Sequence, residues 1–267
     1  MKNKIENLIY DFVHNYEKKY NIKTTWGKPL VGFADANHSY IKNLPELITP
    51  SHEIPTDVLP DASIVIVYYV PFTKELAKTN EACNELASPS WALAYEETNA
   101  MFNELNSYII NYLDKCGYRG GVSSKASTFN KDILKSDWSH RHFAYAAGLG
   151  TFGINNMLIT KKGCCGRFST IVTNLDITPG DPVKDEYCLY KKDGSCAICV
   201  KHCPVNALTI DNYNRDECYK VLQKNAEVYT QFGSSYVDES GQNSNSIGSE
   251  VCGKCITQSP CAFWNLE

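Results

Sequence analysis

The stretch CLYKKDGSCAICVKHCP, from Cys188 to Pro204, ends in the pattern C-x-x-C-x-x-x-C-P, the tail of a cysteine motif that binds 4Fe-4S clusters. The full motif has one more cysteine three residues before Cys196, and that position holds Asp193. Cys188 is the simplest replacement, because Gly194 allows the intervening segment to reverse its direction. We therefore expect an intact iron–sulfur site, with Asp193 as a ligand being the weaker alternative.

The eight cysteines from Cys188 to Cys261 are the number that two four-iron clusters require. The proline after Cys203 marks it as a ligand that crosses to the other cluster, and the last cysteine of the group CGKCITQSPC, Cys261, is expected to cross back. Cys218 completes the count. The first set is then Cys188, Cys196, Cys199 and Cys261, and the second set is Cys203, Cys218, Cys252 and Cys255.

Structural zinc is the competing interpretation, since it also uses two C-x-x-C pairs. The proline-terminated motif favours iron and sulfide. The remaining cysteines, Cys83, Cys116, Cys164 and Cys165, are expected to be buried apolar residues. Cys164 and Cys165 carry a further possibility, because they lie in a turn between two predicted strands that could face a cofactor.

Composition places the chain among soluble globular proteins, with 43% hydrophobic and 21% charged residues. A net charge of −4 argues against a nucleic-acid partner, because phosphate contacts need clustered Lys and Arg. No apolar run is long enough for a membrane helix, and the charged N-terminus lacks the apolar core of a secretory signal. We expect a cytoplasmic protein without disulfides, and oxygen-sensitive clusters suggest an anaerobic host.

Hydrophobic periodicity predicts a mixed α/β (α+β) fold for roughly the first two thirds of the chain. Helices are expected over residues 3–20, 91–116 and 139–150, and strands over 30–36, 63–70, 118–124, 156–160 and 167–175. Prolines and a glycine between 177 and 187 suggest a boundary. We predict an α/β cofactor or substrate domain over 1–180 and a ferredoxin-like double-cluster domain over 181–267. The polar stretch 239–250 is predicted to be a surface loop.

The first part of the chain also resembles a known family. The segment 139–177 contains Ala147-Gly148-Leu149-Gly150, then Gly153, Asn155 and the triplet Gly166-Arg167-Phe168. Epoxyqueuosine reductases show an A-G-L-G-x-x-G-x-N segment, an apolar strand, a G-x-[W/R]-F strand and a double cysteine group, and this chain, with Gly166-Arg167-Phe168 at the last strand, is similar to them. The resemblance extends from about residue 25 to the end.

The resemblance implies a nitroreductase-like domain that binds a corrinoid (cobalamin) and receives electrons from two 4Fe-4S clusters, as in the related reductive dehalogenases. Residues from Ser139 to Asn155 would line the corrinoid pocket. The implied cofactor-binding residues are Ser139, Arg141, Tyr145, Gly148, Gly150, Phe152, Gly153, Asn155 and Arg167. Arg167 could bind a phosphate or carboxylate, or form a structural ion pair. The competing interpretation of AAGLG is a helix end with packing glycines.

Three features depart from the family. Its catalytic aspartate position holds Leu134, which cannot donate a proton, so Asp137, His140 and His142 are the candidate catalytic residues. The chain is expected to lack the C-terminal helical repeat that helps many members to hold tRNA. The acidic net charge also puts a tRNA substrate in doubt.

These patterns predict an iron–sulfur oxidoreductase that passes electrons through two clusters to a corrinoid and a substrate in the N-terminal domain. Its partners would be a small-molecule substrate or a ferredoxin- or flavodoxin-type donor protein, with neither nucleic acid nor membrane. One alternative is a non-catalytic electron-transfer protein whose N-terminal domain docks a redox partner. Another is a nitroreductase-like domain that binds flavin or nothing, with clusters attached.

Overall fold

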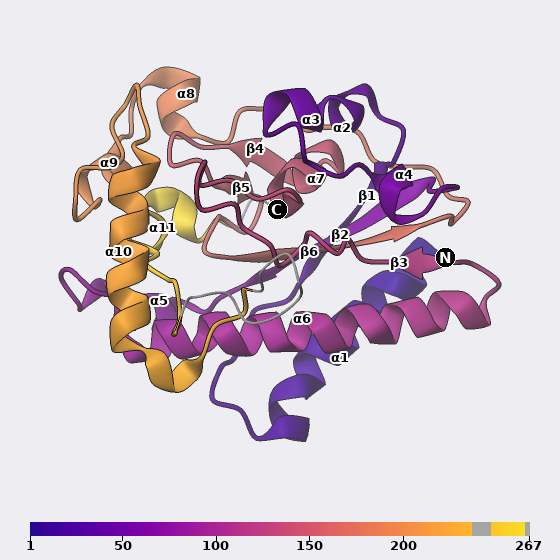
Figure 1. The fold of residues 1–267 in the computed structure, drawn as a ribbon, viewed down its shortest axis with the longest axis horizontal. Coiled ribbons are helices and arrows are strands. Elements are labelled where there is room, and N and C mark those ends of the chain that lie inside the picture. Colours follow the sequence, from indigo (N-terminus) through magenta and orange to yellow (C-terminus); the bar gives the residue numbers. More distant parts are fainter. Residues whose placement is uncertain (237–246, 265–267) are drawn as a thin grey trace.

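A computed structural model of the 267-residue chain describes residues 1–236 and 247–264. Its strands are β1 (Leu30–Asp35), β2 (Ile64–Pro71), β3 (Gly120–Gly121), β4 (Gly150–Phe152), β5 (Leu158–Thr160) and β6 (Gly166–Thr173). Its helices are α1 (Lys2–Tyr20), α2 (Ser39–Lys42), α3 (Leu44–Leu47), α4 (Pro55–Val58), α5 (Lys74–Glu81), α6 (Pro89–Lys115), α7 (His140–Ala146), α8 (Leu189–Asp193), α9 (Ile198–Lys201), α10 (Arg215–Val228) and α11 (Lys254–Thr257), with 3₁₀ turns at Thr230–Phe232 and Pro260–Ala262. Figure 1 shows their arrangement. The expected mixture of helices and strands is confirmed.

The main sheet has the order β1-β2-β6-β3, and each neighbouring pair is antiparallel. Strand β2 is buried along its whole length because it lies between β1 and β6 and is covered on both faces. Its side chains alternate: Ile66 and Tyr68 pack in one core, whereas Val65 and Val67 pack in another. This double burial explains the continuous apolar run at 63–70.

Helices α1 and α6 cover the first face of the sheet (Figure 1). Buried residues of α1 recur at helical spacing, as in Ile5, Ile9 and Val13, and they meet the buried face of α6. The hydroxyl of Ser88 caps α6 by accepting the Trp91 amide at 3.1 Å. Both helices lie where hydrophobic periodicity predicted them.

The opposite face carries α7 and the hairpin of β4 and β5. Helix α7 ends at Ala146, earlier than the predicted 150. The amide of Leu149 donates to the Ala144 carbonyl, and the amide of Gly148 donates to Tyr145, both at 3.0 Å. This pair of bonds is a Schellman cap. Gly148 has φ +75°, and a Cβ there would lie 2.2 Å from the Asp181 carbonyl oxygen, so glycine is required at this turn.

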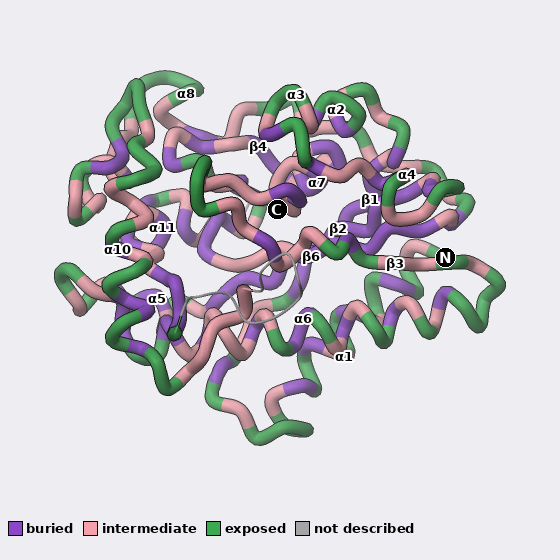
Figure 2. The backbone as a smooth tube through the Cα atoms, in the orientation of Figure 1, coloured by how far each residue is buried: buried purple, intermediate pink, exposed green. Residues whose placement is uncertain are grey.

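The C-terminal segment packs directly onto the start of α6 and the turn before β6. A third core joins Phe72 and Trp91 with Tyr229 and Val251. Figure 2 shows how buried and exposed residues are distributed along the backbone. Most of the predicted surface loop, 239–246, lies outside the described residues, while Ser249 and Glu250 at its described end are buried. The division at residues 180 and 181 stays a prediction.

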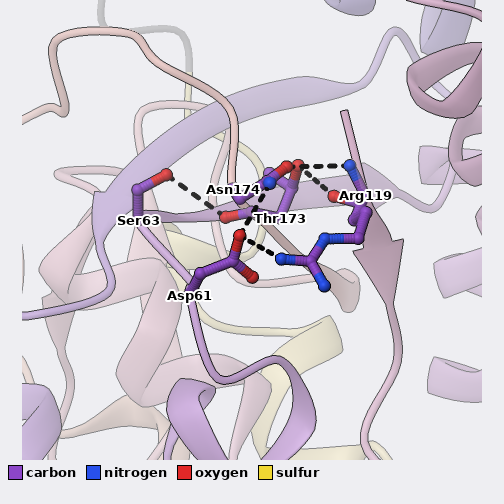
Figure 3. A network of polar contacts seen from close by, with 5 residues as sticks. All are labelled: Asp61, Ser63, Arg119, Thr173 and Asn174. Carbon is purple, nitrogen blue, oxygen red and sulfur yellow. Dashed lines mark hydrogen bonds and ion pairs between the residues drawn. The ribbon is translucent and has the colours of Figure 1, made fainter. Parts of the chain in front are cut away.

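A polar network fastens one edge of the sheet (Figure 3). Asp61 pairs with Arg119 and accepts from the Asn174 amide at 2.9 Å. The Arg119 amide donates to the Asn174 side chain at 2.8 Å, and the Thr173 hydroxyl donates to the Arg119 carbonyl at 2.7 Å. These bonds hold the ends of β6 and β3 to the loop before β2.

Candidate active site

A cavity of about 900 Å³ lies between α6, α7, β6 and the C-terminal segment. This volume is at the upper end of the roughly 300–1,000 Å³ range of small-molecule and cofactor sites. Five of the predicted catalytic and cofactor-binding residues line it: Ser139, His140, Arg141, Asn155 and Arg167. Trp91, Tyr95, Phe168 and Tyr213 add aromatic surface to the same wall.

The start of α7 is held in place by the loop that follows α3. The Nε2 of His52 accepts the Ser139 amide at 3.0 Å, and its Nδ1 contacts the Glu53 carbonyl oxygen at 2.7 Å. The Glu53 amide in turn donates to the Asp137 carbonyl at 3.0 Å. Because both ring nitrogens of His52 are engaged, the imidazole fixes the position from which α7 directs its first residues toward the cavity.

His140 is the first α7 residue on the cavity wall. Its Nδ1 lies 3.0 Å from the hydroxyl of Thr170, which accepts the Trp138 indole N–H at 2.8 Å. Trp138 can only donate, so the Thr170 hydroxyl proton is free for Nδ1, which favours the tautomer with its proton on Nε2. Burial, followed by the charges of Arg167 and Arg141, lowers the pKa of His140 to about 3. The imidazole is therefore neutral near pH 7.

Two arginines line the same cavity. Arg141 donates from Nη1 to the Asn156 carbonyl and lies 3.3 Å from the Met157 sulfur, and burial lowers its pKa. The Arg167 guanidinium stacks on the Tyr95 ring at 3.7 Å from the ring centroid. Its buried Nε has no hydrogen-bond partner among the described residues. An unused donor of this kind suits an anionic or carbonyl group of a ligand.

Helix α6 contributes a polar stripe that sequence reasoning did not single out. Glu96, Asn99, Asn103 and Asn106 recur every three or four residues along it and line the cavity. The Ser235 hydroxyl donates to Oε2 of Glu96, while Oε1 is buried without a partner among the described residues. Burial raises the pKa of this carboxyl. The recurrence of these polar residues every three or four positions along the predicted helix was the available signal.

Several predicted site residues do not line this cavity. Asp137 is buried and accepts the Ser51 hydroxyl at 2.8 Å. His142 lies between Tyr40 and Phe152, and burial lowers its pKa to about 3. Tyr145 joins the same aromatic group. Gly148 and Gly150 lie in the turn and strand after α7, and Gly153 lines a second, smaller cavity.

The eight C-terminal cysteines separate into two groups in space. The smaller cavity is lined by the first predicted set, Cys188, Cys196, Cys199 and Cys261. The large cavity is lined by the second set, Cys203, Cys218, Cys252 and Cys255. Asp193 lines neither cavity; it is exposed, and its carboxylate accepts the Ser195 amide at 2.9 Å.

Electrostatic contacts follow the same division. Burial raises the pKa of the Cys199 thiol to about 11, and the neighbouring thiols of Cys261, Cys188 and Cys196 add to this shift. Burial also raises the pKa of Cys255 well above its usual value, with further contributions from all three other members of the second set. Cys199 contributes to that shift as well, so the two groups are neighbours.

The described residues contain no group of three or more His, Cys, Asp or Glu side chains that converges on one metal ion. A four-iron cluster makes a different demand, because each of its thiolates binds a separate iron. Cys164 is buried with its sulfur 3.9 Å from that of Cys261, beside the first set.

Gly253 and Lys254 separate two cysteines of the second set. Lys254 is buried, and its ammonium donates to the carbonyls of Asn80 and Cys83 at 2.5 and 2.6 Å, where it caps α5. Gly253 has φ +76° and packs against the Trp91 indole, where a Cβ would approach ring carbons to 2.4 Å. The sequence between the cysteines therefore fixes them to α5 and α6.

Comparison with known proteins agrees with the expected resemblance. No family model matches the chain. An epoxyqueuosine reductase of Lactococcus garvieae is 36% identical over 102 residues, which are 37% of this chain and 27% of that protein. No helix among the described residues is long and apolar enough to cross a membrane.

Solved epoxyqueuosine reductases share the fold. The Bacillus subtilis enzyme covers 95% of this chain with a TM-score of 0.54 and 18% identity, and this chain covers 66% of it. The Streptococcus thermophilus enzyme covers 96% of this chain with a TM-score of 0.54 and 18% identity, and this chain covers 67% of it. Another epoxyqueuosine reductase was solved with an epoxyqueuosine-modified tRNA-Tyr stem loop. It covers 95% of this chain with a TM-score of 0.55 and 18% identity, and this chain covers 66% of it. The chain thus has the fold of the epoxyqueuosine reductases and resembles one of them in sequence over 102 residues.

Proposed function

We propose that this chain is an epoxyqueuosine reductase-like oxidoreductase that carries electrons through two 4Fe-4S clusters to a substrate in the large cavity. The observation that supports the proposal best is the separation of the eight cysteines into two sets of four, each at its own cavity. The sequence motif assigned the same eight residues to the same sets. Structural zinc would instead need four ligands around a single ion.

The arrangement of the cavities suggests the direction of electron flow. The second set lines the same cavity as His140, Arg141 and Arg167, whereas the first set lines the smaller cavity. Electrons would therefore enter at the first cluster and leave from the second. The proposed ligands remain those given above, four cysteines for each cluster.

The residues around the large cavity also fit a corrinoid. Aromatic and apolar side chains provide a broad wall, and the unpartnered Nε of Arg167 and Oε1 of Glu96 could meet its polar periphery. When bound, a corrinoid would supply low-potential metal chemistry. The protein would position the substrate, exclude water and supply protons. His140 would act as a neutral hydrogen-bond donor from Nε2, since its pKa of about 3 excludes the charged form near pH 7.

The expectation that nucleic acid is not a partner loses its support, because an enzyme of the same fold was solved with a tRNA stem loop. The net charge of −4 describes the whole chain and leaves room for a local basic region. We therefore include a substrate carried on RNA among the candidates, beside a free small molecule.

Anaerobic purification with iron and sulfide reconstitution tests the clusters. We expect roughly eight iron atoms per chain and a visible spectrum that bleaches on reduction. Colourless protein that contains zinc would contradict the proposal.

Gel filtration after incubation with hydroxocobalamin tests the large cavity. We expect the corrinoid to co-elute with the protein and Asn99→Trp, which fills the cavity, to abolish co-elution without changing the iron content. Asn111→Trp, on an exposed turn of the same helix, is the matched control. Iron-loaded protein that does not bind cobalamin and reduces no substrate would favour the alternative of a non-catalytic electron-transfer protein.

A further inference from the structure

Lysines surround the first cysteine set. Three of the segments that carry or contact its cysteines are the turn after β5, helix α8 and helix α9. Their lysines are Lys161, Lys162, Lys191, Lys192 and Lys201. Four are exposed, and Lys162 is half-buried. Three acidic residues offset part of this charge: Asp193, exposed at the end of α8, Glu186, whose carboxylate accepts the Cys188 amide at 2.8 Å, and exposed Asp185 beside it.

Backbone contacts bring these lysines close to the predicted ligands. Cys188 is the N-cap of α8, and Cys199 lies within α9. In the turn after β5, the Cys164 amide donates to the Cys261 carbonyl at 2.9 Å. The Lys191 ammonium donates to the Phe152 carbonyl at 2.6 Å and so ties α8 to β4. The lysines therefore lie on segments that carry or contact the first set.

Lys28 extends the same region. The Lys162 ammonium donates to the Lys28 carbonyl at 3.0 Å, and Lys28 is itself exposed. Burial, then the charges of Lys28 and Lys161, lower the pKa of Lys162, as expected for like charges held close together. The ion pairs found among the described residues involve none of these lysines. We call Lys28, Lys161, Lys162, Lys191, Lys192 and Lys201 the basic surface.

We propose that the basic surface is the docking site of an acidic one-electron carrier protein that reduces the first cluster. This inference rests on the proposed function. The chain as a whole carries negative charge, so it would repel an acidic carrier except where lysines gather. Complementary charge at the basic surface would steer the carrier to the first cluster, which lies farther from the substrate cavity. Each encounter transfers one electron, so the carrier is oxidised by one electron and the cluster is reduced by one.

RNA phosphates would also be attracted by lysines. The carrier is favoured because the basic surface surrounds the first cysteine set, whereas the large cavity is lined by the second. An RNA-borne substrate would have to reach the large cavity.

The test is stopped-flow reduction of reconstituted protein by an acidic flavodoxin in its hydroquinone form. The altered protein is Lys161→Glu/Lys192→Glu/Lys201→Glu, three exposed lysines whose ammonium groups have no hydrogen-bond or ion-pair partner in the described part of the chain. The matched control is Lys42→Glu/Lys115→Glu/Lys131→Glu, which makes the same charge change at exposed positions outside the segments that carry the first cysteine set. The end of α6 that carries Lys115 lies opposite α8 and α9 (Figure 1).

We expect the triple variant at the basic surface to lower the second-order rate constant for flavodoxin at least about tenfold at low salt, and the control to lower it less than about twofold. The difference should shrink at 0.5 M salt, where charges are screened over a few ångströms. Reduction by the methyl viologen cation radical should be unchanged or faster. Iron content should equal that of the wild type.

Equal flavodoxin rates in the two variants would overturn the inference. An equal loss of the rate of reduction by methyl viologen would also overturn it, because the defect would then lie in the cluster. A loss of tRNA binding in a mobility-shift assay, with an unchanged rate of reduction by flavodoxin, would overturn it as well. Failure of the proposed function is distinct, because wild-type protein would then contain no iron and show no spectral change with either reductant.

Discussion

Replacement of Cys188 by alanine should remove one cluster and leave the other. Cys188 is buried at the smaller cavity with three other cysteines, and none of these four belongs to the second set. Without a fourth thiolate the first cluster should not assemble, so iron should fall from roughly eight to roughly four atoms per chain. The loss of one buried sulfur should by itself cost about 1 kcal/mol of folding free energy, and the absence of the first cluster adds to that cost.

Asp193→Ala is the matched control, because Asp193 occupies the position at which the sequence motif expects a ligand. Its carboxylate is exposed and bonded to the Ser195 amide, so its removal should leave the iron content unchanged. Iron and sulfide analysis, with low-temperature electron paramagnetic resonance of the reduced proteins, measures both variants. Full iron content in Cys188→Ala, or half content in Asp193→Ala, would refute the assignment.

Three further predictions concern residues around the large cavity. Burial raises the pKa of Glu96 in the folded state, so its protonated form favours folding at low pH, and this contribution is lost as pH rises through the folded pKa. Glu96→Gln should therefore have a higher melting temperature than wild type at pH 8, and this difference should disappear at pH 4. A lower melting temperature than wild type at pH 8 would contradict the argument. Gly253→Ala should lower the free energy of unfolding by about 2–4 kcal/mol in urea titration, because it combines a positive φ with a clash against Trp91. Gly194 has the same φ of +76° but open space around it, so Gly194→Ala should lower this free energy by only about 1 kcal/mol. Thr170→Val should lower it by about 1–3 kcal/mol, because the Trp138 indole N–H loses its buried acceptor, and an unchanged midpoint would show that the bond contributes little.

The long elements were predictable because their burial is regular. Strand β2 is apolar throughout since both of its faces are covered, and α6 repeats buried residues at helical spacing over 27 residues. The cysteine motif was equally informative, because its spacings and its proline follow from how a chain wraps around a cluster. Its assignment of the cysteines matches their grouping at the two cavities, while the identity of the bound group stays a prediction.

Features that depend on distant contacts were not predictable. Helix α7 stops at Ala146 in the glycine turn that the competing interpretation of AAGLG describes, but the close approach of Gly148 to the Asp181 carbonyl, 33 residues away in sequence, has no local signal. The predicted strand at 118–124 shrinks to β3, which pairs with β6 over two residues only. The 14-residue helix α10 was not among the predicted helices, because its polar sequence hides its single buried side.

The environment of the histidines could not be predicted for the same reason. A histidine at the start of a helix suggests proton transfer near neutral pH, yet burial beside two arginines holds the pKa of His140 at about 3. Glu96 was overlooked because it lies 44 residues before His140, on another helix. Only folding brings that helix to the same cavity.

The exchange of cysteines between the two groups has a consequence for biosynthesis. In the proposed assignment, three ligands of the first cluster come from residues 188–199, and the fourth waits for Cys261. Neither cubane could be closed on a nascent chain until the ribosome had passed Cys255, and the first could not be closed before Cys261. Cofactor delivery would thus be a late, concerted event that joins the two ends of this segment, and chelation of iron would release both ends together.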